Sequence, residues 1–138
     1  MKRIYVDTSA YLCALLGEEG AAEVVASLGG ARLYSSVLLV LEATRNLQRM
    51  ARSAQLAAPR LNDLLDRVTQ DSEAFTLKEL TLDLCRDPVL PAVTTPRSLD
   101  LAHLRTALWF HRRERLDAYV TRDEAQRNSA RELGLPVV

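Results

Sequence analysis

The sequence predicts an α/β fold in which helices cover both faces of a mostly parallel sheet of four to five strands. Short stretches of strand-forming residues alternate along the chain with longer segments whose apolar residues recur at helical spacing. The first short stretch, Ile4-Tyr5-Val6, is apolar throughout, which is typical of a parallel strand buried on both faces. We expect residues 1–138 to form one domain, which is long enough to bury a sizeable core.

The first half of the chain is expected to contain two strands and four helices. The strands are residues 3–6 and 33–36, and the helices are about 10–16, 18–28, a long segment from 37 that ends before Pro59, and 60–69. Thr8 or Ser9 is expected to cap the first helix, and Ser35 or Ser36 the long one. Gly17 and the Gly29-Gly30 pair are natural helix stops.

The second half is expected to contain three further strands and three helices. The strands are 74–76, 118–121 and a final edge strand at 136–138, and the helices are 77–86, about 98–110 and 124–133. Thr76 and Glu79 match a capping box for the first of these helices, and Ser98 is the expected cap of the second. Pro91 and Pro96 predict a loop between them.

Composition sets limits on the class of protein. Eighteen basic and 18 acidic residues give a net charge of zero, which does not favour a nucleic-acid binder. The exception is a protein whose acids gather around a metal ion and leave the remaining surface basic. No apolar run reaches the roughly 18 residues of a membrane helix, and Asp7 interrupts any signal peptide, so we expect a cytoplasmic protein. Cys13 and Cys85 are expected to be buried free thiols.

Four acids are candidates for a shared site. Asp7 and Asp123 follow predicted strands, Asp100 lies in the first turn of a helix, and Glu42 lies on the long helix. Each has a structural alternative: a turn residue for Asp7, a surface pair with Arg45 for Glu42, dipole complementation for Asp100 and a helix cap for Asp123. Together they favour a site at the carboxyl edge of the sheet, where open α/β proteins bind ligands.

Ligands that are all oxygen atoms suit a hard cation, Mg²⁺ or Mn²⁺, rather than zinc. Several crowded carboxylates repel one another unless a cation neutralises them. Such a site activates water for attack on a phosphodiester. Ser9 and Thr121 are candidate hydroxyl partners of the acids.

Other kinds of chemistry have weaker support. His103 lies among apolar residues of a helix, which favours a packed, hydrogen-bonded core histidine over a general base. With five glycines in all, no Gly-rich phosphate loop is present. A phospho-acceptor receiver domain also uses acids at strand ends but needs a nearby lysine, and Lys2 and Lys78 are in the wrong places.

The motifs resemble those of PIN-domain ribonucleases, and most closely the VapC-type toxins of bacterial toxin–antitoxin pairs. The resemblance rests on Val6-Asp7-Thr8-Ser9, on Glu42, and above all on Ser98-Leu99-Asp100-Leu101-Ala102-His103-Leu104 followed by Val120-Thr121-Arg122-Asp123. It covers nearly the whole chain in order and spacing. Arg105 and Arg122 depart from it, since the family usually has a small residue at the first position and an aromatic or small residue at the second.

The resemblance implies a PIN-like three-layer sandwich and an endoribonuclease that depends on Mg²⁺ or Mn²⁺, with Asp7, Glu42, Asp100 and Asp123 as its acids. It also implies a homodimer that a cognate antitoxin protein holds inactive. The alternative is a degenerate domain that binds RNA or a protein without cutting.

Two arginine clusters are candidate RNA contacts. Arg45 and Arg49, with Arg52 beyond them, lie on the long helix that carries Glu42, and a second cluster is Arg112, Arg113 and Arg115. Solvated helix faces are the competing interpretation. Lys2 and Lys78 are the only lysines, so 16 of the 18 basic residues are arginines, a skew that coding bias explains equally well.

Overall fold

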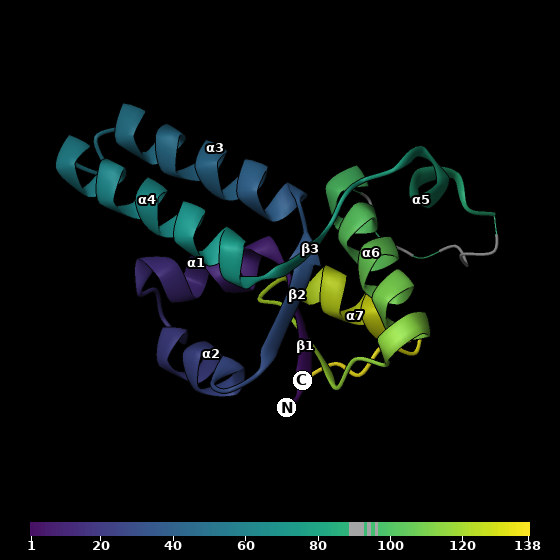
Figure 1. The fold of residues 1–138 in the computed structure, drawn as a ribbon. Coiled ribbons are helices and arrows are strands. Elements are labelled where there is room, and N and C mark those ends of the chain that lie inside the picture. Colours follow the sequence, from purple (N-terminus) through teal and green to yellow (C-terminus); the bar gives the residue numbers. More distant parts are fainter. Residues whose placement is uncertain (89–92, 94, 96) are drawn as a thin grey trace.

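The computed structural model describes residues 1–88, 93, 95 and 97–138, and it confirms the α/β class (Figure 1). Within these residues, four strands form one all-parallel sheet in the order β3-β2-β1-β4. The strands are β1 (Arg3–Val6), β2 (Arg32–Ser36), β3 (Thr76–Lys78) and β4 (Ala118–Val120). The crossover from each strand to the next runs through helices, as parallel pairing requires.

Seven helices of the described chain cover the two faces of the sheet. They are α1 (Thr8–Leu16), α2 (Ala21–Leu28), α3 (Leu38–Arg52), α4 (Ala58–Ala74), α5 (Leu82–Arg86), α6 (Ser98–Glu114) and α7 (Glu124–Glu132). Figure 1 shows α1 to α4 on one side of the sheet and α5 to α7 on the other. The structure is therefore a three-layer sandwich.

The sheet separates two hydrophobic clusters because successive side chains of a strand point to opposite faces. Ile4 and Val6 pack with α1 to α4, whereas Tyr5 packs with α6 and α7. Tyr5, Tyr34 and Tyr119 are all fully buried in the second cluster. The unbroken apolar run at the start of the chain is thus explained by burial on both faces.

The cap of α1 differs from the prediction. Neither Thr8 nor Ser9 caps this helix; the carboxylate of Asp7 does, by accepting the backbone N–H of Ala10 at 2.9 Å. Asp7 is the last extended residue after β1, so its side chain reaches the free N–H groups of the first turn. At α3 neither serine is the N-cap, which is Val37; Ser36, one residue earlier, accepts the N–H of Leu38 at 3.1 Å.

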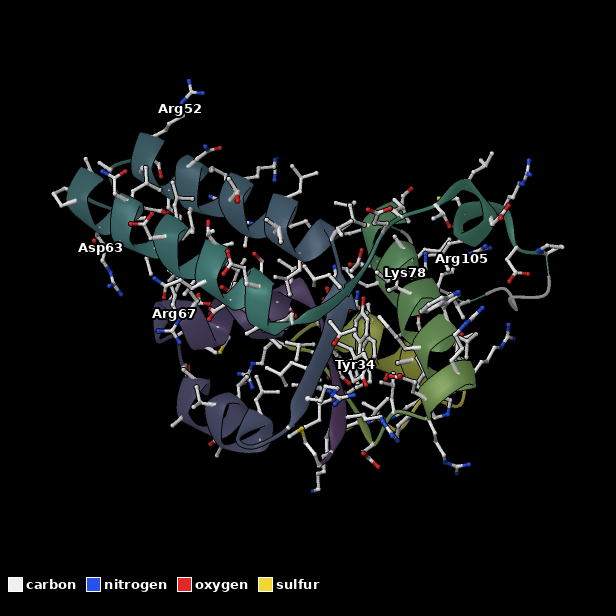
Figure 2. The ribbon with its side chains drawn as sticks, in the orientation of Figure 1. Tyr34, Arg52, Asp63, Arg67, Lys78 and Arg105 are labelled. Carbon is white, nitrogen blue, oxygen red and sulfur yellow. The ribbon has the colours of Figure 1, made fainter. Side chains whose placement is uncertain are left out.

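The predicted helix at 77–86 was wrong in its first half. Residues 76–78 instead pair with β2 as an edge strand, so Thr76 and Glu79 form no capping box. The shorter helix α5 begins after Thr81, whose hydroxyl accepts the N–H of Leu84. Arg105 then joins α5 to α6 by donating to the carbonyls of Leu84, Cys85 and Asp87 (Figure 2). Arg105 therefore has a structural role, because it satisfies carbonyls at the end of a short helix.

Several smaller expectations were also corrected. Residues 136–138 form a single bridge from Val137 to Tyr119 rather than a strand. Ser98 lies inside α6 and does not cap it. Cys13 is buried, but Cys85 is exposed because α5 buries Leu84 instead. Pro91 and Pro96, on which a loop was predicted, lie outside the described residues. None of the described helices is both long enough and apolar enough to cross a membrane.

Candidate functional site

All four candidate acids lie at the carboxyl edge of the sheet. Asp7 directly follows β1, and Asp123 comes three residues after the end of β4. Glu42 is on α3, which leaves the end of β2, and Asp100 is in the first turn of α6. In Figure 1 the strands run upward, and α3 and α6 both begin at the upper edge. Four separate segments of the chain therefore bring their acids to the same edge of the sheet.

Asp7 is the most buried of the four, with 2% of its surface exposed. Besides the N–H of Ala10, its carboxylate accepts the hydroxyl of Ser9 at 2.8 Å and that of Thr121 at 2.5 Å. Burial raises the pKa of Asp7, and the hydrogen bonds from Thr121 and Ala10 oppose that rise. The structure thus places both predicted hydroxyl residues on Asp7.

Thr121 also connects Asp7 to the next acid. Its hydroxyl oxygen accepts the backbone N–H of Asp123 at 3.0 Å, and the carboxylate of Asp123 caps α7 by accepting the N–H of Gln126, also at 3.0 Å. The side-chain amide of Gln126 donates to Asp100 at 3.2 Å. One chain of hydrogen bonds therefore links three of the acids.

Glu42 belongs to a second, buried network. Its Oε1 accepts the hydroxyl of Thr8 at 2.8 Å and lies 2.8 Å from Nε2 of His103, while Nδ1 of His103 lies 2.8 Å from the hydroxyl of Tyr5. A carboxylate only accepts hydrogen bonds, so we assign the ring proton to Nε2 and the Tyr5 hydroxyl as the donor to Nδ1. Burial alone would raise the pKa of Glu42, but the hydrogen bonds that its carboxylate accepts from His103 and Thr8 hold that pKa below its ordinary value.

The sequence prediction for His103 was correct but incomplete. The ring is 2% exposed and fully hydrogen-bonded, as expected of a core histidine. The sequence did not reveal that its partners are Glu42, Thr8 and Tyr5. Thr8 and His103 both occur in the motifs quoted above, so a signal was present, whereas nothing in the sequence marked Gln126.

Negative charge without close ion pairs characterises this edge of the sheet among the described residues. Burial, and then the charge of Asp123, raise the pKa of Asp100, while the positive charge of Arg97 opposes the rise. In the part of the chain that the structure describes, no lysine or arginine forms an ion pair with Asp7, Asp100 or Asp123. Carboxylates that lie near one another and form no close ion pair with a lysine or arginine are a donor set that fits a hard divalent cation.

The donors do not converge on one point. Among the described residues, no three His, Cys, Asp or Glu side chains form a group placed to hold a metal ion. The acids are spaced by the hydroxyl and amide groups between them, so closing around a cation requires side-chain rotation. Asp100 and Asp123 are both partly exposed, which gives them room to rotate.

The arginines predicted to contact RNA project from α3. Arg45 and Arg49 follow Glu42 by three and seven residues and therefore share its side of the helix. With Arg52 and Leu61 they line a hollow of about 890 Å³, and Figure 2 shows Arg52 at the far end of α3. In the second cluster, Arg113 stacks on the ring of Trp109 at 3.9 Å, so part of that cluster has a structural partner.

Comparison with known proteins found no match for this sequence, either among protein-family profiles or among curated proteins.

Proposed function

We propose that this chain is a metal-dependent endoribonuclease that hydrolyses RNA phosphodiesters. The observation that carries the proposal is the meeting of Asp7, Glu42, Asp100 and Asp123 at one sheet edge from four separate chain segments. The motifs that resemble PIN-domain ribonucleases contribute these same four residues. Fold alone is compatible with many activities, so the argument depends on the acids.

Mg²⁺ or Mn²⁺ would be held by these four carboxylates. When bound, the cation supplies Lewis-acid activation of the attacking water and offsets charge on the phosphate oxygens. The contribution of the protein is orientation. Ser9 and Thr121 fix Asp7, and His103 fixes Glu42 and favours its ionised form.

Arg45 and Arg49 are the proposed contacts to the RNA backbone. They are exposed on the side of α3 that carries Glu42, and neither forms an ion pair with an acid within the described residues. At 1.5 Å per residue they lie about 5 and 10 Å along the helix from Glu42, a span of one or two nucleotides. An arginine in that place attracts phosphate and steers the strand toward the acids.

The toxin assignment rests on the resemblance alone. It implies a cytoplasmic homodimer and a cognate antitoxin protein. A gene for a small DNA-binding protein directly upstream would support it against a role in housekeeping RNA processing.

A non-catalytic domain that binds RNA or a protein is the second candidate. The observation that favours it is the absence, among the described residues, of three donors already converged on a metal position. Under this alternative the acids serve as hydrogen-bonding residues of the fold, as Asp7 and Asp123 do in capping α1 and α7.

The test is incubation of the purified, antitoxin-free chain with structured RNAs in Mn²⁺ or Mg²⁺. EDTA and Asp100→Asn should each abolish cleavage, whereas Asp63→Asn, at an exposed position on α4, should leave it unchanged. Mn²⁺ binding is measured in parallel by titration calorimetry. Intact RNA together with no Mn²⁺ binding would refute the nuclease and leave the binding domain.

A further inference from the structure

Gln126 joins two of the candidate acids from within the fold. It is 1% exposed and lies in the first turn of α7. Its backbone N–H donates to Asp123 at 3.0 Å, and its side-chain Nε2 donates to Asp100 at 3.2 Å. A single residue therefore contacts carboxylates that belong to the starts of two different helices.

The residue that these two acids share is uncharged. Asp100 and Asp123 carry like charges when ionised, and Gln126 contacts both. An arginine here would neutralise the pair and occupy the space between the acids. The neutral side-chain amide of Gln126 instead orients Asp100, the backbone N–H of the same residue holds Asp123, and the negative charge of both acids stays in place.

The other end of the Gln126 amide points to a missing partner. Its Oε1 is buried and accepts no hydrogen bond from the part of the chain that is described. A buried acceptor without a donor is costly, so such groups usually face an ordered water. Hydrated Mg²⁺ and Mn²⁺ keep water ligands whose hydrogens are strong donors.

We propose that Gln126 is a positioning residue that holds Asp100 and Asp123 side by side without neutralising them, and that its free Oε1 accepts a hydrogen from a water of the hydrated cation. This inference rests on the proposed cation site. It adds a residue that none of the motifs contains, and it assigns a role to an otherwise unpaired buried atom.

The test compares Gln126→Leu and Gln126→Glu with Gln70→Leu, which replaces an exposed glutamine on α4. Partners that orient metal ligands typically change metal affinity by about 10–100-fold, so Gln126→Leu should weaken Mn²⁺ binding by that factor in calorimetry. Gln126→Glu adds a third negative charge, so it should lower the melting temperature without Mn²⁺ and enlarge the increase that Mn²⁺ produces. Gln70→Leu should match the wild-type chain in both measurements.

A purely structural role has a different signature. It would lower the melting temperature of the Gln126 variants equally with and without Mn²⁺ and leave the affinity of the folded protein unchanged. In the wild-type chain, the NMR signals of the Gln126 side-chain amide should shift as Mg²⁺ is added, a measurement that does not depend on any variant folding.

Unchanged amide signals, or wild-type Mn²⁺ affinity in Gln126→Leu, would overturn the role of Gln126 while leaving the nuclease proposal intact. A wild-type chain that neither binds Mn²⁺ nor cuts RNA would overturn both, and that outcome is recognised without any variant.

Discussion

Two stacked tyrosines allow a controlled test of the network around His103. The rings of Tyr5 and Tyr119 are parallel to within 2°, their centroids are 5.2 Å apart, and both residues are fully buried. The hydroxyl of Tyr5 bonds to His103 at 2.8 Å, whereas that of Tyr119 has no partner among the described residues. Replacing either tyrosine by phenylalanine removes the same atom from similar surroundings, and only one replacement breaks a hydrogen bond.

The expected effects differ in size and sign. Tyr5→Phe should lower the free energy of unfolding by about 1–3 kcal/mol, because Nδ1 of His103 becomes a buried acceptor without a donor. The hydroxyl of Tyr119 loses its hydrogen bonds to water on folding and gains none among the described residues. Tyr119→Phe should therefore leave the free energy of unfolding unchanged or raise it by up to about 1 kcal/mol. At roughly 3 °C per kcal/mol for a chain of this length, Tyr5→Phe lowers the melting temperature by about 3–9 °C.

Urea denaturation at neutral pH, followed by circular dichroism, measures both differences. The slope of unfolding free energy against urea should be the same in all three proteins, which shows that the folded and unfolded states are comparable. Equal losses in the two variants, or a larger loss in Tyr119→Phe, would refute the assigned hydrogen bonding around His103.

Three further changes test other parts of the structure. Thr121→Val keeps the shape of the side chain but removes the hydroxyl that donates to Asp7. It should lower the free energy of unfolding, measured by urea denaturation, by about 2 kcal/mol, whereas Thr121→Ser should keep most of the wild-type stability. The pKa of Asp100 is raised in the folded state, so the contribution of Asp100 to the free energy of unfolding falls as pH rises above the ordinary carboxyl pKa. Asp100→Asn should therefore be more stable than the wild-type chain at neutral pH. The urea midpoints of the two proteins should converge near pH ~3 to ~4. Arg105→Met should speed hydrogen exchange of the α5 amides by about 10-fold or more through the lost carbonyl contacts, and unchanged exchange would contradict its proposed structural role.

The fold class was predictable because the strongest sequence signals coincide with burial. The strand at residues 3–6 was placed correctly, since an unbroken apolar run of β-favouring residues has few other uses in a chain of alternating elements. The helix expected at 77–86 failed because pairing with β2 outweighed a local capping pattern. The edge strand expected at 136–138 failed because only Val137 reaches Tyr119 in register.

The candidate site was predictable to a lesser degree. The carboxyl ends of parallel strands meet at one edge of the sheet, so the sequence alone could group Asp7 with Asp123. The contacts between groups required the tertiary structure. His103 reaches Glu42 across 61 residues and Gln126 reaches Asp100 across 26, and no local pattern in the sequence encodes such pairs.

The way the acids are held distinguishes a binding site from a structural cluster. Asp7, Asp100 and Asp123 are oriented by hydroxyl and amide donors, and none forms an ion pair in the described part of the chain, although 16 arginines are present in the sequence. Burial raises the pKa of Asp7, and burial together with the charge of Asp123 raises the pKa of Asp100, so the ionised acids oppose folding and the charge of Arg97 offsets only part of that cost. Pairing with arginine would relieve this cost but would fill the site. A chain that instead orients its acids and leaves them unneutralised retains the negative charge that a divalent cation requires.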